Sequence, residues 1–394
     1  MDFDYTPQEE AFRQELRAWL EATPPEGYNP ETFEQLDQDK RFEIQLKWQK
    51  RLFAAGWVGI HWPKQYGGRG ATVVEQVIYQ QEMGRVRAPA VANPLGISIV
   101  GPTLMHWGTE DQKKRYVSKI LSAEEIWCQG YSEPGAGSDF ASLQTRAVED
   151  GDSFVVNGQK VWTSYAHKAH YCILVARTDP HAPKHKGLSY LLVDMKTPGI
   201  TVRPLVQITG DAEFNEVFFE DVRVPKANLV GEKHQGWQVA LTTLMFERAN
   251  FGIVYQLEPL LRRLSEVVKQ LRVNGHTAAE DPAVRQKIAQ FHIETQAIKL
   301  NGFRQLTRQL RGDPPGPEGS IGKLAASELN LRVVHFAMEL LGPYSQIALG
   351  ESQGLDGGYW SRRALSSRLY TIAGGTSEVM RNIIGDRVLS LPKG

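Results

Sequence analysis

The sequence has few cysteines, no net charge and no long apolar run, and each absence excludes a class of protein. Its 394 residues contain only Cys128 and Cys172, so no disulfide framework is expected. The 45 basic and 45 acidic residues balance, whereas a nucleic-acid-binding protein usually carries a basic excess. No apolar run approaches the ~20 residues of a membrane span, and the acidic start (MDFDY) is unlike a signal peptide. We therefore expect a cytoplasmic protein with no membrane span and no nucleic-acid partner.

Several catalytic motifs are also missing. The chain has no His-Glu-x-x-His, CxxC or Gly-x-Ser-x-Gly segment, so we expect no metal site and no serine hydrolase chemistry. Residues 319–324 end in Leu324, where a P-loop needs Ser or Thr for magnesium. Residues 135–137 (GAG) resemble part of a dinucleotide fingerprint, but they precede a predicted hairpin rather than a helix, which argues against a Rossmann unit.

The pattern of apolar residues is helical up to about residue 125. Residues 6–9 (TPQE) form a capping box with proline at the first helical position, and they predict a helix over 11–22. An amphipathic run over 31–55 stops at Gly56. Residues 109–112 (TEDQ) form a second capping box ahead of a helix over 113–121.

Between residues 126 and 235 the pattern changes to alternation, which is typical of strands. Asn157-Gly158 lies between two apolar segments and predicts a β-hairpin. Further strands are predicted over 171–177, 188–195, 201–206 and 216–219. Many short strands separated by Gly, Pro or Asp favour an antiparallel barrel or sandwich.

After residue 236 the helical pattern returns. Helices are predicted over 237–271, 283–310, 322–341 and 376–389, and long helices with short connections indicate a bundle. The fold class is therefore α+β and multidomain. We expect an N-terminal helical domain (1–125), a middle antiparallel β-barrel domain (126–235) and a C-terminal helical bundle (236–394).

Four segments could carry chemistry, and each also has an ordinary structural interpretation. Residues 127–139 (WCQGYSEPGAGSD) can expose backbone amides to an anion, or form only a polar turn. Residues 161–164 (VWTS) can pack and hydrogen-bond a planar ring, or hold a core tryptophan. Glu247, in an apolar helical stretch, is either functional or paired with Arg248. The glycines before Thr376 can expose helix amides to an anion, or simply precede a helix cap.

Taken together, these segments resemble the acyl-CoA dehydrogenase family, and the resemblance covers nearly the whole chain. The most specific matches are 132–139 (SEPGAGSD), 158–164 (GQKVWTS) and 374–384 (GGTSEVMRNII). The resemblance implies a bound FAD and dehydrogenation of an acyl-CoA between its α and β carbons. It also implies an electron-transferring flavoprotein as acceptor. Relatives form homo-oligomers (dimers or tetramers), and mixed tetramers occur.

The resemblance also assigns roles to individual residues. Trp162 would pack on the isoalloxazine ring and Ser164 would donate near flavin N5. The complete cofactor-binding set is Gln129, Tyr131, Ser132, Gly137, Ser138, Trp162, Thr163, Ser164, Thr376 and Glu378. The substrate-binding set is Ser138, Met245, Arg248, Gly374 and Gly375.

The position of the catalytic base separates two branches of the family. Many relatives carry a catalytic glutamate where this chain has Gly374. A smaller branch, which includes long-chain and isovaleryl-CoA dehydrogenases, has glycine there and a glutamate on the first long helix of the bundle. This chain has Glu247 at that helix position. Gly374 leaves space near the substrate α-carbon, so we expect Glu247 to be the base.

Three segments depart from the family pattern. The relatives' Arg-x-x-Phe-Gly-x-Pro segment, which reaches the FAD of a neighbouring subunit, is absent from 273–282. Residues 339–343 (ELLGP) replace a Gln and a Gly-Gly pair, and 344–370 is longer than usual. Contacts across a subunit interface are therefore not assigned by the resemblance.

Other functions fit part of the same pattern. One is an acyl-CoA oxidase or a desulfinase on the same scaffold. Another is an FAD-binding subunit of a mixed complex without chemistry of its own, although a silent subunit would not need Glu247. A purely structural helical protein would need neither the glycines of 135–138 nor those of 374–376.

Overall fold

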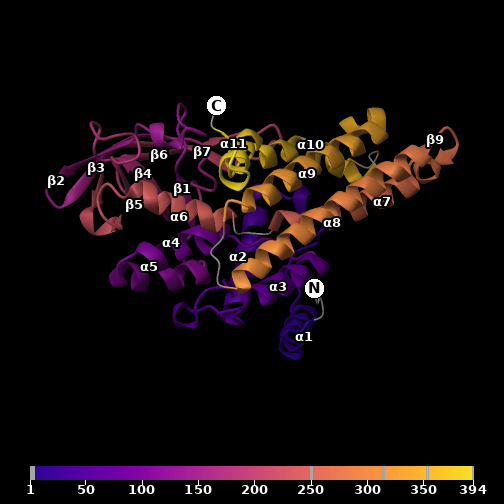
Figure 1. Ribbon diagram of the computed structural model, residues 1–394, viewed down its shortest axis with the longest axis horizontal. Coiled ribbons are helices and arrows are strands. Elements are labelled where there is room, and N and C mark those ends of the chain that lie inside the picture. The colour runs from indigo at the N-terminus through magenta and orange to yellow at the C-terminus, as the bar shows by residue number, and fades with distance from the viewer. Residues whose placement is uncertain (1–4, 249–251, 312–315, 352, 354, 393–394) are drawn as a thin grey trace.

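The computed structural model describes residues 5–248, 252–311, 316–351, 353 and 355–392. It has helical N- and C-terminal domains and a middle sheet domain. The sheet and the long C-terminal helices lie side by side along the longest axis, with the N-terminal helices on one side of both (Figure 1). Over the described residues, no helix combines the length and the apolar character needed to cross a bilayer.

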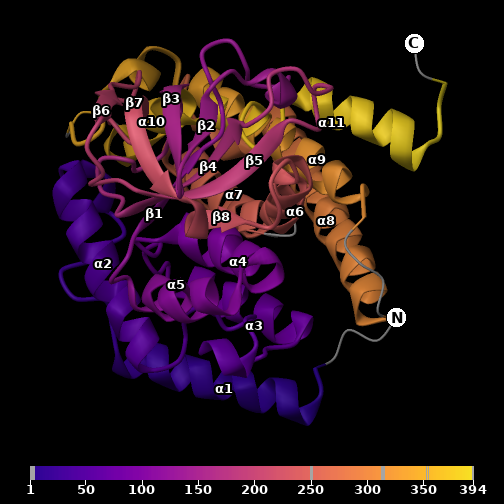
Figure 2. The ribbon, with the colours of Figure 1, turned by 90° about the vertical axis from the view of Figure 1, so that its left-hand side faces the viewer.

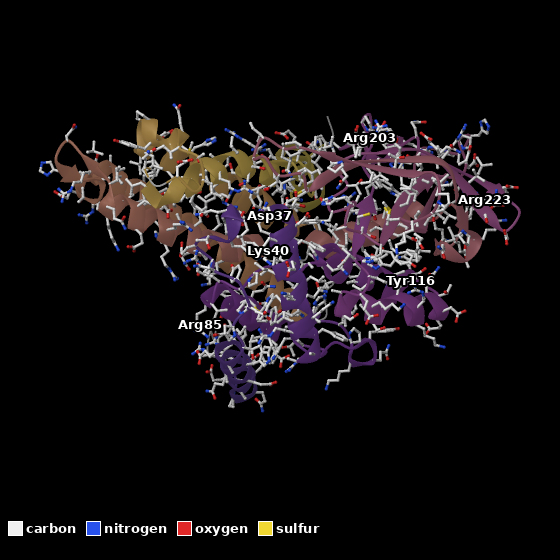
Figure 3. The ribbon with its side chains drawn as sticks, turned by 180° about the vertical axis from the view of Figure 1, so that it is seen from behind. Asp37, Lys40, Arg85, Tyr116, Arg203 and Arg223 are labelled. Atoms are coloured by element: carbon white, nitrogen blue, oxygen red, sulfur yellow. The ribbon has the colours of Figure 1, made fainter. Side chains whose placement is uncertain are left out.

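The N-terminal domain forms where the sequence predicts helices. Its helices are α1 (Pro7–Ala22), α2 (Gln38–Ala54), α3 (Val73–Arg85), α4 (Gly101–Trp107) and α5 (Glu110–Ser122). Both predicted capping boxes are confirmed, at Thr6 and at Thr109. The predicted start of the second helix is wrong, because the Asp37 carboxylate accepts the Lys40 N–H at 2.8 Å and so begins α2 at Gln38 (Figure 3).

The middle domain is one eight-stranded sheet. Its strands are β1 (Trp127–Gly130), β2 (Arg146–Asp150), β3 (Ser153–Lys160), β4 (Tyr171–Arg177), β5 (Leu188–Asp194), β6 (Ile200–Leu205), β7 (Phe214–Pro225) and β8 (Leu229–Val230). Their order is β6-β7-β3-β2-β4-β5-β8, with β1 also paired to β4. No pairing among residues 126–235 joins β6 to β8, so the pairings do not show the predicted barrel closure.

The prediction of a purely antiparallel sheet is wrong, because β1 and β2 both run parallel to β4. Trp127 pairs with Tyr171 near one end of β4, and Arg146 pairs with Arg177 at the other. The loop between β1 and β2 carries the chain onward in the same direction, so the two strands follow each other along one edge of β4.

The predicted hairpin at Asn157-Gly158 is also wrong, because β3 runs straight through these two residues. The Asn157 side chain bonds the backbone and carboxylate of Asp221 on β7, and the register shifts there by a bulge. A Cβ on Gly158 would lie 2.5 Å from Thr145 Oγ1, so the glycine permits a close approach of strands. The chain instead turns between β2 and β3 at Gly151, which has a positive φ.

The C-terminal domain packs long helices around an apolar core. Its elements are α6 (Gly236–Arg248), α7 (Gly252–Gln270), β9 (Arg272–Val273), β10 (His276–Thr277), α8 (Pro282–Leu310), α9 (Gly319–Leu341), α10 (Tyr359–Ser367) and α11 (Ser377–Ile383). The helix predicted over 237–271 corresponds to α6 and α7, and residues 249–251 fall outside the described part. The predicted helix over 376–389 changes at Ile384 into a π-helical turn.

Two features join the domains. Helix α6 lies between the sheet and α4, where Thr243 bonds Thr103 at 3.0 Å and Tyr190 at 3.3 Å (Figure 2). On another face, Asp211 in the β6–β7 loop pairs with Arg41 of α2 and with Arg362 of α10. All three domains therefore meet at this one carboxylate.

Candidate functional site

The glycine-rich segment at 131–139 is held by a buried ion pair. The Glu133 carboxylate accepts the N–H groups of Gln144 (2.6 Å) and Thr145 (2.8 Å) and the Nζ of Lys160 (2.9 Å). Burial raises the pKa of Glu133, but the charge and hydrogen bonds of these partners outweigh it and leave the pKa below its usual value. Burial lowers the pKa of Lys160 to about 8 against the opposing charge of Glu133.

The other side of this segment is open. Gly135, Gly137 and Ser138 are exposed, and no atom lies within 4 Å of where a Cβ would stand on either glycine. A cavity of about 490 Å³ adjoins the turn and is lined by Glu133, Pro134, Gly135, Ala136, Ser142, Gln144, Thr145, Gly158 and Gln159. Internal packing therefore does not require the two glycines, which leave the backbone accessible to a ligand.

The segment after β3 exposes a large aromatic side chain. Trp162 is 61% exposed, has a left-handed backbone (φ +59°) and packs edge-on against Phe214. Thr163 is buried. Its backbone N–H donates to the Asn215 carbonyl, and its carbonyl accepts the Asn215 side-chain amide. Its Oγ1 has no hydrogen-bond partner among the described residues. The interpretation of Trp162 as a core tryptophan is wrong. The arrangement offers an aromatic face beside an unpaired hydroxyl.

The candidate base lies in the last turn of α6. Met245, which is 46% exposed, precedes it by two positions. The backbones of Glu247 and Arg248 belong to α6, but their side chains fall outside what the structure describes. Their predicted roles therefore stay predictions.

The closing loop before α11 depends on two glycines with positive φ, +66° at Gly374 and +102° at Gly375. Lys323 of α9 donates to the Gly375 carbonyl at 2.5 Å, and Thr376 caps α11 through the Val379 N–H at 3.2 Å. These contacts hold the loop between two helices. The positive φ also gives a backbone reason for glycine at 374, in addition to the space that it leaves.

Glu378, in the first turn of α11, is exposed. Hydrogen bonds from its own backbone N–H and from Thr376 lower the pKa of this carboxyl. Over the described residues, no group of three or more His, Cys, Asp or Glu side chains is placed to hold a metal ion.

Comparison with known proteins covers the chain almost end to end. The model of the acyl-CoA dehydrogenase N-terminal domain matches residues 6–124, that of the middle domain matches 128–222, and that of the C-terminal domain matches 234–389. The chain belongs to the acyl-CoA dehydrogenase family. It is therefore an oxidoreductase, and membership of the family supports acyl-CoA dehydrogenation as its general activity.

Individual members of the family resemble the chain over their full length. It is 39% identical to the acyl-CoA dehydrogenase IpdE1 of Mycobacterium tuberculosis over 391 residues, which are 98% of each chain. A solved structure titled Tcur3481-Tcur3483 steroid ACAD matches with a TM-score of 0.86 and 33% identity over all of both chains. The ChsE4-ChsE5 complex from M. tuberculosis matches with a TM-score of 0.84 and 32% identity, also over all of both chains.

Within this acyl-CoA dehydrogenase, the structure joins the first two predicted segments directly. The Ser132 carbonyl accepts the Val161 N–H at 2.9 Å, so the residues from 129 to 138 adjoin those from 161 to 164. The closing loop is bonded to α9. The predicted site residues do not include Glu133, Lys160 or Lys323, although Lys160 follows Phe154 and Val156 in the alternation of buried positions along β3.

Replacing Gly375 by alanine is expected to lower the free energy of unfolding by about 1–3 kcal/mol, the cost of a non-glycine residue in a strained backbone conformation. The new Cβ would lie 2.5 Å from the Met380 methyl, which can move, but the positive φ would remain. Chemical unfolding of the variant and the parent measures the difference. Gly135→Ala is the control, because open space surrounds that position and little change is expected. Equal losses in both variants would contradict the argument.

Proposed function

We propose that this chain binds FAD and desaturates an acyl-CoA between its α and β carbons, with Glu247 removing the α-proton. Family membership supports the reaction class. The observation that carries the cofactor proposal is the exposed Trp162 ring beside the unpaired hydroxyl of Thr163. When bound, FAD supplies the acceptor for the β-hydride at its N5.

The residues present fit FAD. The Trp162 face suits the isoalloxazine, and an unpaired buried Thr163 hydroxyl is costly unless a ligand bonds it. The exposed glycines of the 131–139 turn and the adjoining cavity suit a phosphate-bearing chain. We therefore assign the cofactor to Gln129, Tyr131, Ser132, Gly137, Ser138, Trp162, Thr163, Ser164, Thr376 and Glu378.

The remaining chemistry falls to the chain's own groups. The α-hydrogen of a thioester is a weak acid, so its removal needs donors fixed on the carbonyl oxygen. The backbone N–H groups of the closing loop at Gly374 and Gly375 supply such donors without any side chain. Glu247 takes the proton as general base, while Met245 and Arg248, on the same helix, contact the substrate together with Ser138.

We propose domain boundaries at 125/126 and 235/236.

Anaerobic mixing with a panel of acyl-CoA thioesters tests this function. The panel should include straight-chain, branched and steroid acyl-CoA thioesters, because one solved relative is titled a steroid ACAD. We expect at least one thioester to bleach the flavin absorbance. No bleaching by any member would contradict the proposal. Hydrogen peroxide formation in air, compared with dye reduction, separates an oxidase from a dehydrogenase that passes electrons to an electron-transferring flavoprotein.

A second candidate is the FAD-binding subunit of a mixed complex. Residues 272–277 form the β9–β10 hairpin in the region where the family's interface segment is absent, and two solved relatives carry two chain names in their titles. We therefore propose an oligomer, either a dimer or tetramer of this chain or a mixed tetramer. The mass from light scattering and the flavin content, both measured on the chain purified alone, distinguish an assembly of this chain from a mixed tetramer.

Trp162→Ala is expected to weaken FAD binding by about tenfold, as loss of an aromatic stacking partner predicts. Because the ring is mostly exposed, the apoprotein should unfold at nearly the same temperature. Fluorescence titration with FAD measures the first effect and thermal unfolding the second. Phe53→Ala, which removes a half-exposed aromatic from α2, is the control. An unchanged dissociation constant for Trp162→Ala would remove this residue from the proposed site.

A further inference from the structure

Lys160 is fully buried at the end of β3, yet the reaction proposed above gives it no role. Its ammonium donates to the Tyr131 carbonyl at 3.0 Å and to Glu133 at 2.9 Å. A buried ion pair is often no more stabilising than apolar side chains of the same volume, so stability alone does not explain this one. Its contacts point instead to the backbone around Ser132.

The bond to Tyr131 sets the direction of a backbone donor. In a planar trans peptide the C=O of one residue and the N–H of the next point in opposite directions. Because the Tyr131 carbonyl points inward to Lys160, the Ser132 N–H points away from it. The next peptide is fixed as well, since its carbonyl accepts the Val161 N–H and its N–H donates to the Ala136 carbonyl at 3.0 Å.

Glu133 completes the arrangement. It holds Lys160 in place and also accepts the N–H groups of Gln144 and Thr145, at the other end of the glycine-rich loop. The Glu133 carboxylate thus joins both ends of residues 133–145 to Lys160 at the end of β3. Breaking the pair would release the loop and allow the Tyr131–Ser132 peptide to rotate.

We propose that Lys160 and Glu133 are positioning residues that orient the Ser132 N–H toward the flavin before the cofactor arrives. The inference rests on the proposed function, because it assumes that Ser132 faces FAD. The pair sets the direction of a donor: Lys160 is fully buried, and the Glu133 carboxylate is already bonded to Lys160 and to the N–H groups of Gln144 and Thr145. It therefore governs cofactor affinity more than the stability of the fold.

The main test is the double variant Lys160→Met with Glu133→Gln. It removes both charges together, so no unpaired charge is left in the interior and the chain should still fold. Glu133→Gln alone leaves the buried Lys160 ammonium without its counter-charge, so this variant should lower the free energy of unfolding and serves as the destabilised comparison. We expect FAD to bind about tenfold more weakly to the double variant, as for loss of a charge-assisted hydrogen bond.

A readout without cofactor separates positioning from general destabilisation. Amide hydrogen exchange of the apoprotein should accelerate over 133–145 in the double variant, where the N–H groups of Gln144 and Thr145 are bonded to Glu133, and stay unchanged in α1–α5. Glu82→Gln is the matched control, since that buried carboxylate pairs with Arg17 (2.7 Å) and Arg85 (2.7 Å) in the helical domain. It should lower stability without altering FAD affinity.

The pH dependence gives a second readout. Lys160 carries its proton below about pH 8 and loses it above, and the titratable groups that act on it are Glu133 and the Cys172 thiol. Burial favours the neutral lysine in the folded chain, so deprotonation does not by itself destabilise the fold. Deprotonation removes the charged hydrogen bonds that the Lys160 ammonium donates to the Tyr131 carbonyl and to Glu133. FAD should therefore dissociate faster at pH 9 than at pH 7 from the parent and from Glu82→Gln, and at equal rates from the double variant.

Two failures are distinguishable. If the parent chain takes up no FAD, alone or with a partner chain, the proposed function fails. If the parent binds FAD and the double variant matches it in affinity, pH dependence and exchange over 133–145, the function stands. The positioning role of Lys160 and Glu133 is then overturned.

Discussion

Glu247→Gln is expected to leave FAD bound and to slow flavin reduction by acyl-CoA by about 10²–10⁴-fold, the usual contribution of a general base. Glutamine has nearly the shape of glutamate but cannot accept the α-proton. Stopped-flow absorbance under anaerobic conditions, with a thioester that reduces the parent enzyme, measures the rate. Substrate binding should change little, because the amide conserves size and polarity.

Glu258→Gln is the matched control for this variant. It makes the same chemical change on the neighbouring helix α7, where the carboxylate pairs with Lys299 at 3.0 Å. We expect near-normal flavin reduction from it. An unchanged rate in Glu247→Gln would show that another group is the base, although the family and the cofactor could still be correct.

Asp211→Ala should markedly destabilise the protein. Its carboxylate lies between Arg41 and Arg362, and all three side chains are less than a fifth exposed. Removing it leaves the two partly buried guanidinium groups with Glu34 as their remaining shared partner, at 3.3 Å from Arg41 and 3.6 Å from Arg362, so we expect a cost of up to about 3 kcal/mol. Because this carboxylate joins the three domains, the variant should also open the domain junctions to protease.

Urea unfolding and limited proteolysis measure these two effects. Asp150→Ala is the control, because its partner Arg223 lies on the sheet surface and both side chains are more than half exposed (Figure 3). A surface pair of that kind contributes about 0–1 kcal/mol. Equal losses of stability in Asp150→Ala and Asp211→Ala would contradict the role given to the interdomain cluster.

Local signals in the sequence predicted the helices well. The capping boxes at Thr6 and Thr109 form as expected, because a cap involves only residues three positions apart. The amphipathic pattern does not show the start of α2, because the pattern continues upstream of the capping residue Asp37. The motifs at 132–139 and 374–384 sufficed to indicate the family, because its functional residues lie in short continuous segments.

The dipeptide Asn-Gly occurs twice, and it forms a turn in the C-terminal domain but not in the sheet. Asn274-Gly275 makes the tight turn between β9 and β10, with positive φ at both residues. Asn157-Gly158 makes no turn, because Asp221 on β7 bonds the asparagine and Thr145 packs against the glycine. The local turn preference yields to pairing with β7, where Asp221 lies 64 residues from Asn157 along the chain.

By itself, the sequence determined which segments are helical, which alternate as strands, and to which family the chain belongs. Each of these properties depends on residues that are neighbours along the chain. Only the tertiary structure decided that the sheet is mixed, that Trp162 faces outward, and that Lys160 is buried against Tyr131 and Glu133. These depend on contacts between distant segments, where burial and hydrogen bonding among many partners outweigh local preference.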